Sequence, residues 1–135
     1  MSVATIRTKL ATAVANISSL KVYTTWPLPV PGEYPCFIIW PKLGNWDANL
    51  PRTLPVIRWE GWLITGRQGR VEDAQTTIDG YLDTNGTNSV KAAIETYTGY
   101  SPDCNYARVI GWTDYGGMDV DQIPLFHVKF EIETR

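Results

Sequence analysis

The segment IPLFHVKFEIETR, residues 123–135, constrains the fold more than any other part of the chain, because its apolar and polar side chains alternate strictly from Phe126 to Glu133. Successive side chains of a β-strand point to opposite faces of a sheet, so this alternation predicts a strand with one apolar and one polar face. The apolar face consists of Phe126, Val128, Phe130 and Ile132, and the polar face of His127, Lys129, Glu131 and Glu133. A sheet is therefore part of the fold.

Four more segments have strand patterns: SSLKVYTTW (18–26), CFIIW (36–40), VIRWEGWLITG (56–66) and YARVIGWTDYG (106–116). CFIIW is continuously apolar, which is typical of a strand covered on both faces. In 56–66 the only charges are Arg58 and Glu60, and they share one side of the strand with Trp62. We expect that side to be solvated at one end or to contact a partner.

Three segments have the three- or four-residue apolar spacing of helices. The apolar positions are Ile6, Leu10, Ala13, Val14 and Ile17 in the first, Val71, Ala74, Ile78 and Leu82 in the second, and Val90, Ala93, Ile94 and Tyr97 in the third. Ser2 can cap the first helix. The second spans about 70–83 and carries acidic side chains in its first turn, where the helix dipole favours them.

A polar turn, DTNGTN (83–88), separates the second and third helices. Asn85-Gly86 readily takes positive φ and can end the second helix. Thr87 or Asn88 can then cap the third. Neither short helix is stable alone, so both must bury their apolar sides against the same sheet.

The order helix, three strands, two helices, two strands predicts an α+β fold in a single domain, residues 1–135. We expect a mixed or antiparallel sheet of about five strands, with the N-terminal helix and the helix pair packed on one face. A proline-containing loop, 41–55, follows the second strand, and an acidic turn, 114–122, precedes the last one.

No catalytic, cofactor-binding or metal site is predicted, so we expect a protein that is not an enzyme. His127 is the only histidine and falls on the polar face of a strand, where we expect it to lie on the surface. Cys36 and Cys104 are too few for a disulfide framework or a zinc site and are expected to be free thiols. The acidic turn does not match the spacing of a calcium loop, and GRQGR (66–70) lacks the lysine of a phosphate-binding loop.

Composition narrows the choice of partners. The net charge of −2 gives no basic excess for nucleic-acid binding, and no run approaches the roughly 20 apolar residues of a membrane span. The N-terminal segment has no signal-peptide pattern, so a cytosolic location is expected. Six tryptophans and seven tyrosines accompany only three phenylalanines, an excess that suits subunit contacts, although core packing is the simpler interpretation for most of the tryptophans.

The layout of the whole chain resembles the tail terminator (tail completion) proteins of long-tailed bacteriophages. The resemblance lies in an N-terminal helix leading into a strand, the strand closed by proline, the helix–turn–helix block and the terminal hairpin. The corresponding segments are IRTKLATAVANISSLKVY (6–23), YPCFIIWP (34–41), AQTTIDGYLDTNGTNSVKAAIE (74–95) and the aromatic-rich final strand. Together these segments span nearly the full length of the chain.

This resemblance implies a virion protein of the tail or neck that is assembled in the host cell cytoplasm. It implies a ring of subunits, typically a hexamer, that caps the completed tail tube and joins it to the head-side connector or stopper protein. DNA would pass through the ring without sequence-specific binding, and no cofactor or membrane is implied. Two alternatives remain open: another neck protein, such as a connector or stopper, or a small glycan- or ligand-binding module that uses the tryptophans.

We expect assembly contacts in three places. Trp46 is predicted to anchor the long loop as a contact arm, because a loop tryptophan has no local core to join. Arg58 and Trp62 lie on the exposed side of their strand. Asp114, Asp119 and Asp121 are predicted at a hairpin tip that faces either the channel or a basic patch on the tail tube.

Overall fold

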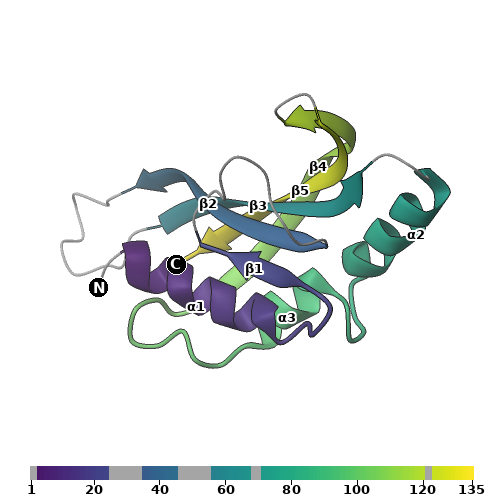
Figure 1. Ribbon diagram of the computed structural model, residues 1–135. Helices are drawn as coiled ribbons and strands as arrows, with labels where there is room; N and C mark the ends of the chain where they lie inside the picture. Colours follow the sequence, from purple (N-terminus) through teal and green to yellow (C-terminus); the bar gives the residue numbers. More distant parts are fainter. Residues whose placement is uncertain (1–2, 25–34, 46–55, 68–70, 121–122) are drawn as a thin grey trace.

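The computed structural model describes residues 3–24, 35–45, 56–67, 71–120 and 123–135, and these contain three helices and five strands (Figure 1). In chain order the elements are α1 (Val3–Ala15), β1 (Lys21–Tyr23), β2 (Cys36–Asn45), β3 (Val56–Arg67), α2 (Val71–Leu82), α3 (Val90–Thr96), β4 (Ala107–Val120) and β5 (Ile123–Thr134). The predicted α+β class and the predicted order of elements are both confirmed.

The five strands form one mixed sheet in the order β1-β2-β3-β5-β4. β1 runs parallel to β2, and the other neighbours are antiparallel. β5, the last strand of the chain, lies between β3 and β4. β1 pairs only with Cys36 to Ile38, so β2 is itself an edge of the described sheet from Ile39 onward. The other edge is β4.

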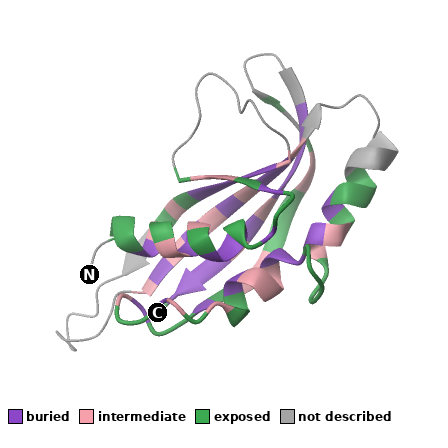
Figure 2. Cartoon of the chain, turned by 60° about the horizontal axis from the view of Figure 1, so that its bottom comes forward, coloured by how far each residue is buried: buried purple, intermediate pink, exposed green. Residues whose placement is uncertain are grey.

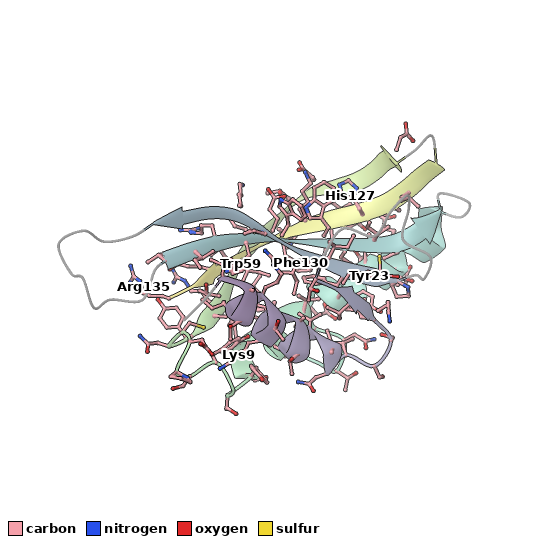
Figure 3. The ribbon with its side chains drawn as sticks, turned by 60° about the vertical axis from the view of Figure 1, so that its left-hand side comes forward. Lys9, Tyr23, Trp59, His127, Phe130 and Arg135 are labelled. Carbon is pink, nitrogen blue, oxygen red and sulfur yellow. The ribbon has the colours of Figure 1, made fainter. Side chains whose placement is uncertain are left out.

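All three helices pack on one face of the sheet, as predicted, and Figure 1 shows them along its lower and right-hand side. One core cluster joins the two layers. Its members include Ile6, Leu10 and Val14 of α1, Ile78 of α2, Val90 and Ile94 of α3, and Phe37, Trp59, Leu63, Val128 and Phe130 of the strands. Trp59 and Phe130 lie between the strands and α1 in Figure 3, and Trp59 Nε1 donates to Thr134 Oγ1 at 2.9 Å. Figure 2 shows buried residues concentrated in the strands and on the helix sides that face them.

The turn between α2 and α3 contains the predicted positive φ, 108° at Gly86. The predicted cap of α3, however, is wrong. Ser89 is the N-cap: its hydroxyl accepts from the Ala92 N–H at 3.0 Å and donates to the Asp83 carbonyl. A buried Ser89 therefore holds the end of α2 and the start of α3 together, which an exposed Thr87 or Asn88 does not do.

Two predicted loops are shorter in the structure. β2 continues through Pro41 to Asn45, because a register shift between Pro41 and Leu43 accommodates the proline on a free edge. β4 continues to Val120, so most of the predicted acidic turn is strand. The ladder of β4 passes a bulge between Thr113 and Gly116, where Asp114 takes a φ of 58°.

The connection 97–106 is tied to α1 by one lysine. Lys9 Nζ forms an ion pair with Asp103 at 2.7 Å and donates to the carbonyls of Tyr100 and Ser101. The chain end is fixed nearby, where Arg135 and Tyr106 exchange backbone hydrogen bonds. This tie holds the start of β4 in place beneath the helix layer.

Candidate interaction surface

The face of the sheet that points away from the helices, here called the outer face, carries a row of paired charges. Arg58 contacts both Glu131 and Glu133 at 3.2 Å, and Arg108 also contacts Glu133 at 3.2 Å. The sequence places Glu133 correctly on this face, but the residue is buried rather than solvated. Two guanidinium groups compensate its charge, as a buried carboxylate requires.

Trp62 lies on the outer face between polar groups and a small buried apolar cluster, which consists of Cys36, Ile38, Ile64 and Leu125. Its ring stacks on His127 at 5.7 Å between centroids, Lys129 Nζ lies 4.1 Å from its centroid, and its indole N–H donates to Glu60 at 3.0 Å. Lys129 also pairs with Asp114 at 3.1 Å. Trp62 is thus held from several sides.

His127 is buried, with 6% of its surface exposed, so the prediction of a surface histidine is wrong. Figure 3 shows it on the side of the sheet opposite Trp59 and Phe130, as its position in the alternation requires. The stacked Trp62 covers it, and its Nδ1 lies 3.0 Å from the Gly116 carbonyl oxygen. Burial lowers the pKa of His127, and the hydrogen bond to Gly116 partly opposes this shift.

A hollow of about 430 Å³ opens beside Trp62, at the free edge of β2. It is lined by Trp40, Pro41, Lys42, Glu60 and Trp62, and we call it the Trp40 hollow. Trp40 is 49% exposed, and Lys42 Nζ lies 3.9 Å from Glu60 Oε1. The hollow therefore combines two indole rings with one cation and one anion.

The opposite edge of the sheet carries a second apolar patch. On β4, Ile110 is 43% and Trp112 50% exposed, and we call this pair the β4 ridge. Trp112 contacts Tyr115 at 5.9 Å between ring centroids. Tyr115 packs on Phe126 and donates its hydroxyl to Asp79 of α2 at 3.0 Å. Trp112 of the ridge therefore rests against a tyrosine that is itself held by the core and by α2.

The structure separates the predicted contact residues. Arg58 and Trp62 lie on the outer face. Asp114 is exposed but sits at the bulge and pairs with Lys129 instead of forming a hairpin tip. Asp119 is exposed on β4, opposite Pro124. Trp46 and Asp121 lie outside the described residues, and so does most of the predicted contact arm.

Sequence reasoning missed the two most exposed tryptophans of the described residues. It assigned Trp40, Trp59, Trp62 and Trp112 to strands or their borders and favoured core packing for most tryptophans. Among these four only Trp59 is a fully buried core residue. Trp40 and Trp112 are exposed because their strand segments are edges of the sheet, a property that the local pattern does not contain.

Metal-binding groups and cysteine thiols were considered among the described residues. These residues contain no group of three or more His, Cys, Asp or Glu side chains that could hold a metal ion. Cys36 and Cys104 are free, as expected, and both are buried. Burial raises the pKa of Cys36 to about 12 and also raises that of Cys104, so both remain protonated thiols at neutral pH.

Comparisons with known proteins leave the family open: no model of a known protein family matches the chain, and a search of curated proteins finds no significant relative. Within the described ranges, no helix has the length and apolar character needed to cross a membrane. The class defined here is an α+β domain with one helix-covered face and one charged, tryptophan-bearing face.

Proposed function

We propose that the chain is a structural virion protein, without enzymatic activity, that acts as a phage tail terminator. It assembles into a ring, a hexamer by the resemblance, that caps the tail tube and joins it to the head-side connector. The order of helices and strands supports this proposal, because the segments that resemble the family fall on α1 and β1, on β2, on the α2–α3 pair and on the β4–β5 hairpin.

The observation that carries the proposal is the presence of half-exposed tryptophans at both edges of one sheet. Trp40 and Trp112 each leave about half of a large apolar surface in water. Aromatic side chains placed this way are typical of protein interfaces. A ring needs two different patches on each subunit, because every subunit contacts its neighbours head to tail.

The charge distribution supports a passage for DNA. The net charge is −2, and the cations described on the outer face, Lys42, Arg58, Arg108 and Lys129, are all paired with carboxylates. Affinity for DNA grows with the number of phosphates that free cations neutralise. A surface of paired charges lets DNA slide through the ring without being retained.

The proposal places the protein in the virion, at the neck, after assembly in the host cytoplasm. Its partners are the tail tube protein on one side and the connector or stopper protein on the other. Native mass spectrometry and electron microscopy of the purified chain, alone and with tail tubes, test this assignment. We expect closed rings that bind at tube ends. A chain that stays monomeric at micromolar concentration, even with tubes present, contradicts it.

A neighbouring assignment is another neck protein, which differs in partner rather than in class. Binding to the head-side connector without binding to tube ends would favour it. A different class is a glycan- or ligand-binding module, and the Trp40 hollow is the observation in its favour, because flat indole rings stack on sugars. Calorimetric titration of a monomeric chain with oligosaccharides would distinguish this function from the ring.

A further inference from the structure

One cross-strand row on the outer face runs between the two free edges of the sheet. Trp40 lies opposite Glu60, Glu60 opposite Glu131, and Glu131 opposite Gly111. Gly111 lies between the two residues of the β4 ridge. Trp112 itself lies opposite the inward-facing Phe130 and contacts Tyr115, so it points toward the helix side of β4. The Trp40 hollow and the β4 ridge therefore lie at opposite edges of the sheet, and their strands are roughly 14 Å apart at the usual spacing of about 4.8 Å.

We propose that the Trp40 hollow of one subunit receives the β4 ridge of the next. This inference rests on the proposed function, since it names the surfaces through which copies of the chain form the ring. A contact between two different patches is heterologous, and it leaves one hollow and one ridge unused until the chain of subunits closes on itself. Closure fills every hollow with a neighbour's ridge.

The shape and polarity of the two patches fit each other. The hollow is concave, about 430 Å³ in volume, and lined by Trp40, Trp62 and Pro41 as apolar surfaces. The ridge consists of one indole and one branched aliphatic side chain. Burying a tryptophan in a preformed apolar pocket is the typical anchor of a strong interface.

The charges at the rims also fit. Lys42 and Glu60 border the hollow, and Arg108 and Asp114 precede and follow the ridge along β4, where they pair with charges of the outer face. Lys42, Arg108 and Asp114 are each more than half exposed at the side chain. Each rim therefore offers a cation and an anion to the other. Exposed pairs of this kind add little affinity but help to set the orientation of the partners.

The contact is made by side chains rather than by strand addition. Pro41 has no N–H to donate, and the register shift beside it interrupts a regular ladder on the edge of β2. On the other edge, the N–H of Val109 already donates to Glu95 of α3 at 3.0 Å. If the sheet continued from one subunit into the next, the backbone at Pro41 and Val109 could not form the hydrogen bonds of a regular strand ladder.

Disulfide cross-linking tests the contact directly, because the native Cys36 and Cys104 are buried and do not compete. A chain carrying both Lys42→Cys and Ile110→Cys should give, on mild oxidation, a ladder of covalent oligomers that ends at the ring size. A mixture of the two single variants should give dimers only. The control pair Lys42→Cys with Asn85→Cys, which uses the exposed turn between α2 and α3, should give no ladder.

Side-chain removal supplies a second readout. Trp40→Ala and Trp112→Ala should each weaken self-association by at least about tenfold while the melting temperature of the monomer stays nearly unchanged. Tyr106→Ala, which removes an aromatic side chain 38% exposed outside both patches, is the matched control.

The outcomes separate the contact from the proposed function. If rings bind tail tubes but the chain with Lys42→Cys and Ile110→Cys gives no ladder, the contact is overturned and the proposed function stands. Rings that cross-link as expected but ignore tail tubes support the contact and contradict the tail role. Dimers formed by Lys42→Cys alone would overturn the contact, because they join two hollows. The contact is also overturned if Trp40→Ala still forms intact rings but no longer binds a glycan or the tube protein, because the hollow then has another occupant.

Discussion

The ring of Phe37 on β2 lies over Gly61 on β3, in the space that a side chain at Gly61 would fill. A Cβ atom on Gly61 would collide with Phe37 Cζ and come within 2.9 Å of Cε1. Phe37 in turn packs on Phe130 of β5, with ring centroids 5.9 Å apart. The absence of one side chain thus lets aromatic rings from two other strands meet beneath the helix layer.

Adding a single methyl group at this point should therefore be costly. We expect Gly61→Ala to lower the free energy of unfolding by about 1–3 kcal/mol through overpacking. Gly80, in the last turn of α2, has open space around its Cβ position, so Gly80→Ala should raise stability by up to about 1 kcal/mol. Urea unfolding of both variants measures the difference. A Gly61→Ala variant that is as stable as the wild type would show that Phe37 can move aside at no cost.

Ser89 provides a second test, in the turn between α2 and α3. Ser89→Ala removes both the N-cap of α3 and the hydrogen bond to the Asp83 carbonyl, so we expect a loss of about 1–2 kcal/mol. Thr87→Ala changes an exposed hydroxyl two residues earlier and should stay within about 0.5 kcal/mol of the wild type. Equal losses in the two variants would contradict the assignment of the cap.

This turn shows what a local pattern can and cannot specify. The positive φ at Gly86 follows from the Asn-Gly pair, and the two apolar helices on either side follow from their spacing. The cap does not follow, because Thr87, Asn88 and Ser89 can all accept the hydrogen bond. Only the position of Ser89 next to the end of α2, a tertiary relationship, makes the choice.

The interaction surface is less predictable from the local sequence than the turn is. Trp112 belongs to a segment that the sequence correctly predicts as a strand, but its exposure depends on β5 entering between β3 and β4. Pairing order arises from contacts between distant segments, so a local pattern does not reveal which strand forms the edge. The alternation did place His127 and Glu133 on the outer face. Their burial depends on Trp62, Arg58 and Arg108, which come from other strands.

His127 should make stability depend on pH, since burial lowers its pKa in the folded protein. The unfolded chain, with a pKa near 6.5, takes up the proton first as the pH falls. Stability is therefore fully present above about pH 6.5 and declines below it, by at most about 1.4 kcal/mol per pH unit.

The measurement is the urea midpoint between pH 7.5 and 5.5, and His127 is the only histidine in the chain. His127→Gln keeps a donor for the Gly116 carbonyl but does not titrate, so its midpoint should be flat across this range. Wild type and variant with the same slope would assign the pH dependence to other groups.

Arg58 gives the last prediction, because it was expected to be an assembly contact and the structure shows a role within the subunit. Its guanidinium bridges Glu131 and the buried Glu133, while Arg108 approaches Glu133 from the more exposed side. Arg58→Met leaves the buried carboxylate with one exposed partner. We expect a loss of about 1–3 kcal/mol, below the range for a fully buried pair because Arg58 is partly solvated.

Arg108→Met should cost less than about 1 kcal/mol. Arg58→Lys keeps the charge but has a single ammonium in place of the two-pronged guanidinium, so it should fall between wild type and Arg58→Met. Unfolding of monomers and ring formation by the folded fraction are measured separately. If Arg58→Met unfolds like the wild type but no longer assembles, Arg58 acts between subunits and not in holding Glu133.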